Sequence, residues 1–251
     1  MRTGGTFGKV SVFLRSFLIQ GSWNNRTMIG GGFVFALLPF LRRVFKGDEE
    51  GFQKALHRHS EHFNAHPYFS SLALGAACRM EEEAEDPEEI RRFKSAVRGP
   101  LGSLGDAVVW VGWRPALVLG ALTLALAGAP PGVTVAFFLI GYNVGHLTLR
   151  IWGFKAGLER GKRVGDSVRA ARFPKIADTL AAAGVFLLGG LVGLAFGKAL
   201  DVFSWALLLL ALTGGVWGIW LGSLVGQKGW RWSFWAVFAT LGVVFLAGWF
   251  G

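Results

Sequence analysis

The sequence predicts an all-α integral membrane protein, a polytopic helix bundle with about five spanning helices and an N-terminal interfacial or re-entrant helical region. Three long stretches contain no Asp, Glu, Lys or Arg: residues 179–197, 202–227 and 232–251. Each approaches the roughly 20 apolar residues that a helix needs to cross a bilayer. Residues 107–128, interrupted by Arg114, and residues 132–149 are also long enough. A soluble domain has no use for five such stretches, because a core helix needs only one apolar stripe.

The first of two predicted regions, residues 1–100, combines amphipathic and re-entrant helices on the cytoplasmic side. Residues 10–19 form a short amphipathic segment interrupted by Arg15, which is typical of a helix lying in the membrane interface. Residues 27–41 are uncharged and contain Pro39, but fifteen residues are too few for a comfortable span. With the short apolar stretch 67–78, they are typical of the discontinuous helices of transporters.

The second region, residues 101–251, is a predicted transmembrane bundle with a basic cytoplasmic loop at 150–178. Residues 150–175 hold eight Lys or Arg against two acids, whereas no basic residue lies between Arg114 and Arg150. The positive-inside rule then places the N-terminus in the cytoplasm and the C-terminus outside. The net charge of +10 therefore indicates contact with anionic membrane lipid, and not with nucleic acid. Closely spaced glycines at 189–193 favour tight helix–helix contacts.

Several kinds of chemistry are excluded or disfavoured by residue usage. A single cysteine, Cys78, excludes an internal disulfide and a metal site built from several cysteines. The first residues have Arg15 in their middle and lack the apolar core of a cleavable signal peptide. We expect no bound cofactor.

Four of the five histidines lie within residues 57–66, in and before the stretch HFNAHP. His59, His62 and His66 would share one face of a helix, but His66 precedes Pro67 and is biased out of the helical region. The helix is therefore predicted to end near Ala65. No acid or cysteine lies at ligand spacing, so we predict no metal site, and no serine indicates a catalytic triad. Two interpretations stay open: a polar helix end that binds a polyhydroxylated solute, or ordinary capping at the interface.

Asp106 stands at the threshold of the first full span, after three glycines and a proline. An ionisable group at a membrane boundary is a functional candidate, but an aspartate before an apolar run is also a common N-cap. Both interpretations stay open, and Arg114 is expected to be buried and to pair with Asp106. Asn143 and His146 are expected to form an interhelical hydrogen-bond pair.

The acidic run at 81–89 holds seven acids in nine residues. It is either a docking surface for a basic partner or a solvated face with helical charge pairing. The second is favoured, because Glu88 and Glu89 precede Arg91 and Arg92 at helical spacing.

Five motifs occur in the order and spacing of one family: FLRSFLIQGSWN at 13–24, GGGFVFALLPFLRRVF at 30–45, FNAHP at 63–67, GPLGSLGDAVVW at 99–110 and YNVGHLTLRIWGFKAG at 142–157. On these motifs the chain resembles the enzyme IID component of the mannose-type (mannose/fructose/sorbose) sugar phosphotransferase system, over nearly its full length. Family members usually have threonine where this chain has Ala65, and serine where it has Ala107. The loss of these two hydroxyls bears on the sugar preference and not on the architecture.

The resemblance implies a membrane subunit of the bacterial cytoplasmic membrane that pairs with a IIC subunit to translocate a hexose: mannose, glucose, fructose or an amino sugar. Soluble IIA and IIB proteins carry the phosphate on histidines, and IIB phosphorylates the sugar. The resemblance therefore implies that this chain is not itself phosphorylated and holds no catalytic residue. It also implies trimers of IIC–IID pairs.

The resemblance places Asn64, His66 and Pro67 along the sugar path near the IIC interface. Further substrate-binding candidates are Asp106, Gln20, Trp23 and Asn24, since an aromatic ring beside amide side chains suits a sugar. Two other functions stay open. One is a stand-alone secondary transporter, for which only Asp106 offers an intramembrane carboxylate. The other is a membrane anchor or regulatory partner of phosphotransferase proteins without transport.

Overall fold

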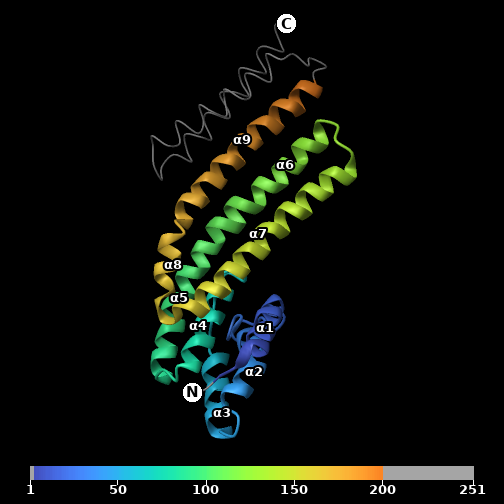
Figure 1. Ribbon diagram of the computed structural model, residues 1–251. Helices are drawn as coiled ribbons and strands as arrows, with labels where there is room; N and C mark the ends of the chain where they lie inside the picture. The colour runs from blue at the N-terminus through green and yellow to red at the C-terminus, as the bar shows by residue number, and fades with distance from the viewer. Residues whose placement is uncertain (1–2, 200–251) are drawn as a thin grey trace. The chain divides into compact units, whose positions relative to one another are not determined.

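The computed structural model describes residues 3–199, and helices make up nearly all of this part (Figure 1). The predicted all-α class is confirmed. The α-helices are α1 (Gly5–Arg15), α2 (Gly30–Val44), α3 (Glu49–Ser60), α4 (Ser70–Glu82), α5 (Pro87–Gly105), α6 (Arg114–Leu126), α7 (Pro131–Arg160), α8 (Val164–Ala170) and α9 (Phe173–Ala199). Three short helices join them: η1 (Ser16–Leu18), the π-helix η2 (Asp106–Trp113) and η3 (Gly161–Arg163).

Two compact units make up the chain. Of the described residues, the first unit contains 3–109 and 143–175, and the second contains 110–142 and 176–199. In the second unit α6 lies beside the first half of α7 and beside α9 (Figure 1). Gly120 of α6 allows this approach, because a Cβ there would lie 3.0 Å from the Phe137 ring and 3.9 Å from Leu187.

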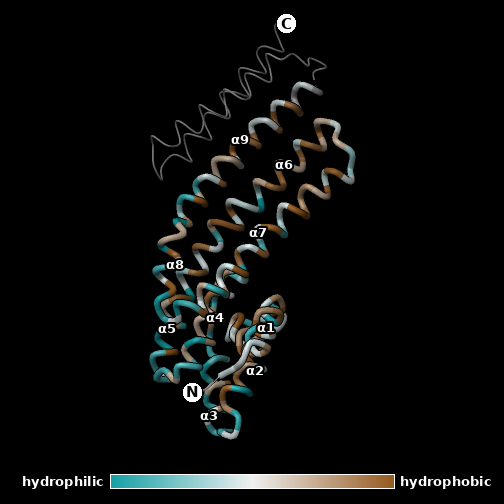
Figure 2. The backbone as a smooth tube through the Cα atoms, viewed as in Figure 1, coloured by the Kyte–Doolittle hydropathy of each residue, from teal (hydrophilic) through white to brown (hydrophobic). Residues whose placement is uncertain are grey.

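Three helical stretches of the described chain are long and apolar enough to cross a membrane: Pro87–Leu126, Pro131–Ala170 and Phe173–Ala195. They contain the predicted span 132–149 and all but the last two residues of the predicted spans 107–128 and 179–197. The predicted spans 202–227 and 232–251 lie outside the described residues. Hydrophobic residues follow α6, α7 and α9, and hydrophilic residues gather around α3 and α5 (Figure 2). The apolar side chains of the spans point away from protein, with Val111 and Ile140 each 65% exposed, as expected for lipid-facing helices.

The helical run from α5 into α6 is irregular. Pro100 lies inside α5, the π-helix η2 follows it, and Pro115 stands in the first turn of α6. Asp106 has helical backbone angles of φ −62° and ψ −46°, and its N–H bonds to the carbonyls of Gly102 and Ser103. The N-cap interpretation of Asp106 is therefore wrong, because this residue lies within the run and not at its start. A π-helical stretch inside a helix frequently marks a functional site.

The short apolar stretch 27–41 becomes α2, which is the core of the first unit. Phe33, Leu37 and Phe40 are fully buried, and α2 packs against α1, α3 and α4. The glycines at its start bring it close to its neighbours: a Cβ on Gly32 would overlap the Ile19 carbonyl, and a Cβ on Gly30 would overlap the Glu61 carbonyl. Burial in protein thus accounts for an apolar helix too short to span.

Helix α7 touches α4 through glycines on both sides. A Cβ on Gly157 would overlap the Leu72 carbonyl oxygen, and a Cβ on Gly75 would overlap the Phe154 carbonyl oxygen. The two backbones are therefore in direct contact, which holds the long helix against the core of the first unit.

Gly157→Ala tests this contact. Overpacking of a tight interface costs roughly 1 to 3 kcal/mol, so we expect the apparent Tm in detergent to fall by roughly 3 to 10 °C. The matched control is Gly165→Ala in α8, where no described atom lies within 4 Å of an added Cβ and the Tm should hold or rise slightly. Equal Tm values for the two variants would contradict the close contact.

Candidate functional site

The segment that carries the FNAHP motif is extended and is held by backbone hydrogen bonds to a distant loop. Helix α3 ends at Ser60, five residues before the predicted end near Ala65, so that prediction is wrong. Phe63 N–H donates to the Thr27 carbonyl at 3.2 Å, and Ile29 N–H donates to the Phe63 carbonyl at 3.1 Å. These bonds take the place of further helical turns. His59, His62 and His66 consequently do not share a helix face, and the described residues contain no His, Cys, Asp or Glu group suited to a metal.

The loop paired with this segment contains three predicted site residues. Asn24 and Met28 exchange backbone hydrogen bonds of 3.2 and 2.8 Å. The Asn24 side chain donates to the Ser22 carbonyl and to Thr27 Oγ1, and accepts the N–H groups of Arg26 and Thr27. Asn24 is therefore engaged in shaping the loop. Gln20 and Trp23 are exposed, with 56% of Trp23 accessible.

Helix α5 meets the same segment through its glycines. A Cβ on Gly102 would lie 3.8 Å from both the Asn64 carbonyl oxygen and the Ala65 Cα, and a Cβ on Gly105 would overlap the His66 side chain. Asp106 follows Gly105 directly and is exposed, as is Asn64. The FNAHP and GPLGSLGD motifs thus lie against each other, and the loop that contains Asn24 is joined to the FNAHP segment through Met28.

His66 and Pro67 are buried at this contact. His66 Nδ1 accepts the N–H of Tyr68 at 3.2 Å, and the His66 carbonyl accepts the N–H and the hydroxyl of Ser70 at the start of α4. Burial, with smaller contributions from the charges of Arg150 and His146, lowers the pKa of His66 to about 4. A neutral, buried imidazole anchors the segment and does not present itself to a solute.

Arg150 is a buried residue of the site that the sequence analysis treated only as the first charge of the basic loop. Its guanidinium donates to His146 Nε2 at 2.6 Å and to the Ser16 carbonyl at 2.8 Å, and lies over the rings of Phe17 and Tyr68. The spacing of four residues from His146 within one motif was the available signal. Arg150 links α7 to the end of α1 and to the segment after His66.

One expectation about the spans needs correction, and one gains contacts. His146 accepts a hydrogen bond from Arg150 on its own helix and stacks on Tyr68 at 4.1 Å, while its pairing with Asn143 stays a prediction. Arg114 is exposed to the surroundings of the protein and lies 5.3 Å from the Trp110 ring centre, so the prediction that it is buried is wrong.

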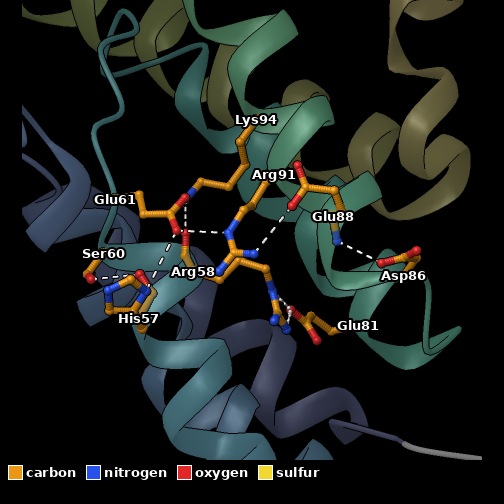
Figure 3. A network of polar contacts seen from close by, with 9 residues as sticks. All are labelled: His57, Arg58, Ser60, Glu61, Glu81, Asp86, Glu88, Arg91 and Lys94. Atoms are coloured by element: carbon orange, nitrogen blue, oxygen red, sulfur yellow. Dashed lines mark hydrogen bonds and ion pairs between the residues drawn. The ribbon is translucent and has the colours of Figure 1, made fainter.

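A buried charged cluster fixes the helices around the FNAHP segment (Figure 3). Glu81 Oε1 accepts hydrogen bonds from Arg58 Nε at 3.1 Å, Arg58 Nη2 at 2.6 Å and His59 Nε2 at 2.8 Å. Lys94 Nζ donates to the Arg58 carbonyl at 2.6 Å. All four residues are at most 3% exposed, so α3, α4 and α5 meet through this cluster.

The cluster shifts three pKa values, and burial lowers that of Lys94 to about 7. Burial alone would raise the pKa of Glu81, but the hydrogen bond from His59 and the charge of Arg58 outweigh it and lower that pKa. Burial lowers the pKa of His59 to about 4; the bond to Glu81 opposes this shift and the charge of Lys94 adds to it. The carboxylate is therefore ionised and the imidazole neutral.

The remaining acids of the run 81–89 are engaged within the protein. Glu82 pairs with Lys9 at 2.8 Å, and Glu85 pairs with Lys162 at 3.0 Å. Asp86 caps α5, while the other acids pair along their helices: Glu83 with Arg79, Glu88 with Arg91 and Glu89 with Arg92. This pattern supports charge pairing over a docking surface for a basic partner.

Comparison with known proteins decides the family of the chain. The model of the PTS system mannose/fructose/sorbose family IID component matches residues 8–203. This chain belongs to the IID family. The resemblance inferred from the five motifs is confirmed, and so is the membrane location.

Curated IID relatives share about a third of the aligned residues. The chain is 31% identical over 186 residues to the mannose-specific EIID component of Escherichia coli (strain K12), covering 72% of this chain. It is 30% identical over 187 residues to the fructose permease IID component of Bacillus subtilis (strain 168), covering 72% of this chain and 67% of that relative. The chain spans 65% of the length of the mannose-specific relative.

Solved structures agree with the IID assignment. One is the cryoEM structure of the mannose transporter ManYZ in complex with microcin E492, with a TM-score of 0.60 and 29% identity over 75% of this chain and 70% of that chain. Another, described as a membrane protein, has a TM-score of 0.66 and 30% identity over the same shares.

The lowered histidine pKa values predict acid sensitivity. The pKa of His59 and that of His66 fall from 6.5 to about 4 on folding, so the unfolded chain binds more protons between these limits. The stabilising contribution is present above pH 6.5 and is lost as the pH falls toward 4. Between pH 7.5 and 5.0 each histidine should cost about 2 kcal/mol of stability.

The measurement is the apparent Tm in detergent at both pH values. His59→Gln should lose about half of the drop, whereas His57→Gln, an exposed histidine on the same helix, should keep all of it. The same drop in His59→Gln as in the unsubstituted protein would refute this account.

Proposed function

We propose that this IID chain forms a hexose permease with a IIC partner in the bacterial cytoplasmic membrane. Sugar that passes through the pair is phosphorylated by phospho-IIB as it reaches the cytoplasm, and the phosphate comes from phosphoenolpyruvate through the soluble IIA and IIB proteins. The match to the IID family across residues 8–203 carries this proposal. The charge asymmetry supports a cytoplasmic N-terminus and an outside C-terminus. Trimers of IIC–IID pairs follow from the same family assignment.

The sugar site proposed for this chain combines exposed residues of the Asn24 loop, the FNAHP segment and the GPLGSLGD motif. Asn64 supplies an amide, Asp106 a carboxylate, and Gln20 and Trp23 an amide and an aromatic face, and all four are exposed. Amides and carboxylates hydrogen-bond hydroxyls, while an aromatic ring covers the apolar face of a sugar. His66, Pro67 and Asn24 act as positioning residues, because their groups are buried or engaged in the loop.

The test is phosphoenolpyruvate-dependent sugar phosphorylation in membranes that contain this chain, with and without its IIC partner, supplied with the soluble components. We expect sugar phosphate only when both membrane chains are present, and a panel of mannose, glucose, fructose and amino sugars then defines the substrate. No phosphorylation of any hexose by a stable IIC–IID complex would overturn the permease and favour a regulatory membrane anchor. Uptake by this chain alone would favour a secondary transporter.

Asn64→Ala tests the sugar site. The loss of one hydrogen-bonding amide from the path should lower phosphorylation-coupled uptake by about tenfold or more, because an unpaired sugar hydroxyl costs about 1 to 3 kcal/mol. Assembly with IIC, measured by co-purification, should persist. The matched control is Gln53→Ala, another exposed amide whose partner is Glu49 on its own helix. Normal uptake by Asn64→Ala would refute the role of this amide.

A further inference from the structure

A groove of about 440 Å³ opens between the end of α3 and the first half of α5. Its lining holds four cations, Arg91, Arg92, Lys94 and Arg98, and two carboxylates, Glu61 and Glu88. We call it the α5 groove. Several of these side chains appear in Figure 3, where Arg91 lies between Glu61 and Glu88.

The cations come from one face of α5, since Arg91, Lys94 and Arg98 are spaced i, i+3 and i+7. Arg91 is paired with Glu61 at 2.9 Å and with Glu88 at 3.4 Å. The contacts of Lys94 and Arg98 are with uncharged groups. Lys94 Nζ donates to a backbone carbonyl and lies over the Phe33 ring, and Arg98 Nη1 lies 3.0 Å from His62 Nδ1. Lys94 is buried and engaged, so the positive charge open to a ligand is that of Arg98, which has no carboxylate partner among the described residues, and that of the exposed Arg92.

The mixture of charges selects a class of ligand. A phosphate monoester carries about −1.5 to −2 charges at pH 7, and the planar guanidinium of arginine matches its oxygens. The carboxylates would repel a bare anion or an acidic peptide, but they accept hydrogen bonds from hydroxyls, and Ser95 in the lining both donates and accepts. A volume of about 440 Å³ is that of a small-molecule site. A phosphorylated polyol meets all of these conditions.

The groove lies close in sequence to the proposed sugar site. His62, which contacts Arg98, lies two residues before Asn64, and Gly102, one turn after Arg98, faces the Asn64 carbonyl. Residues 62–64 and helix α5 thus contribute both to the α5 groove and to the proposed sugar site.

We propose that the α5 groove binds the sugar phosphate, the product of the proposed reaction, through its phosphate monoester. This inference rests on the proposed function and assigns the product to residues of this chain. Arg98 and Arg92 hold the phosphate, while Glu61, Glu88 and Ser95 receive hydroxyls of the sugar.

The experiment is isothermal titration of the detergent-purified full chain with mannose 6-phosphate, glucose 6-phosphate, free mannose and inorganic phosphate. We expect a sugar phosphate to bind at least about tenfold more tightly than free mannose or inorganic phosphate, and binding to weaken as salt rises. Arg98→Gln should weaken this binding about tenfold, and Arg98→Lys, which keeps the charge, by less. The matched control is Arg169→Gln, an exposed arginine paired with Asp166 on α8, which should change nothing.

Arg92→Gln provides a second variant, because the Arg92 side chain is 70% exposed and pairs with Glu89 one turn away, so its loss should not affect folding. It should weaken binding about threefold. Equal affinity for mannose and its phosphate, or equal affinity of Arg98→Gln and Arg169→Gln, would overturn the proposal. Displacement of the sugar phosphate by short-chain phosphatidylglycerol at equal or lower concentration would also overturn it, because the groove would then be a lipid site.

Parallel phosphorylation assays separate this proposal from the function on which it rests. Sugar-phosphate binding that depends on Arg98, in a chain that supports no sugar phosphorylation with IIC, would support the groove and refute the permease. Phosphorylation with IIC in the absence of any such binding would refute the groove alone.

Discussion

The first unit depends on the buried carboxylate of Glu81. An ionised group inside protein costs several kcal/mol unless donors surround it, and removal of one partner from such a pair is strongly destabilising. Arg58 and His59 on α3 supply the donors for Glu81 on α4, and Lys94 on α5 closes the cluster through the Arg58 carbonyl. The last turn of α3 is thereby fixed to two other helices. The chain must leave α3 at Ser60 along one path, and that path leads directly into the FNAHP segment.

Backbone contacts then determine which side chains of that segment face outward. The bonds of Phe63 to Thr27 and Ile29 set its direction, and the glycines of α5 allow its backbone to lie flat against the helix. Successive residues of an extended chain point to opposite sides. Phe63 and Ala65 are consequently buried and Asn64 is exposed. His66, which the alternation alone would expose, is buried because Gly105 of α5 allows the helix to lie against its side chain. Asn64 is available to a ligand because the residues on both sides of it are used for packing.

The membrane class and three of the spans could be predicted from the sequence. Long apolar runs with few charges fit helices that cross a bilayer, whereas a core helix of a soluble domain needs only one apolar stripe. The family could be read from five short motifs in order. The end of α3 could not be predicted from the sequence. The hydrogen bonds that replace its last turns come from Thr27 and Ile29, which lie more than thirty residues earlier in the chain. Close glycine contacts were predicted around residues 189–193, whereas nothing in the sequence singled out Gly157, where an added Cβ would overlap the Leu72 carbonyl oxygen. The sequence also did not show that Glu81 is the buried member of the run of seven acids. Its burial depends on Arg58, which lies on another helix.

The charged residues of α5 lie towards its start and its last residues are uncharged. This distribution matches the charged product and the neutral substrate of the proposed reaction, the sugar phosphate and the free sugar. The first half of α5 carries the cations of the groove, whereas residues 99–105 are uncharged and rich in glycine. A neutral sugar loses little when it lies against the uncharged half beside Asn64. Its phosphate ester carries up to two negative charges, which meet no cation there and are matched by Arg98 one turn away. If the chain acts as proposed, phosphorylation would reverse the preference of the sugar for the two halves of one helix, and the return of the product into the path would become unfavourable without any movement of the protein.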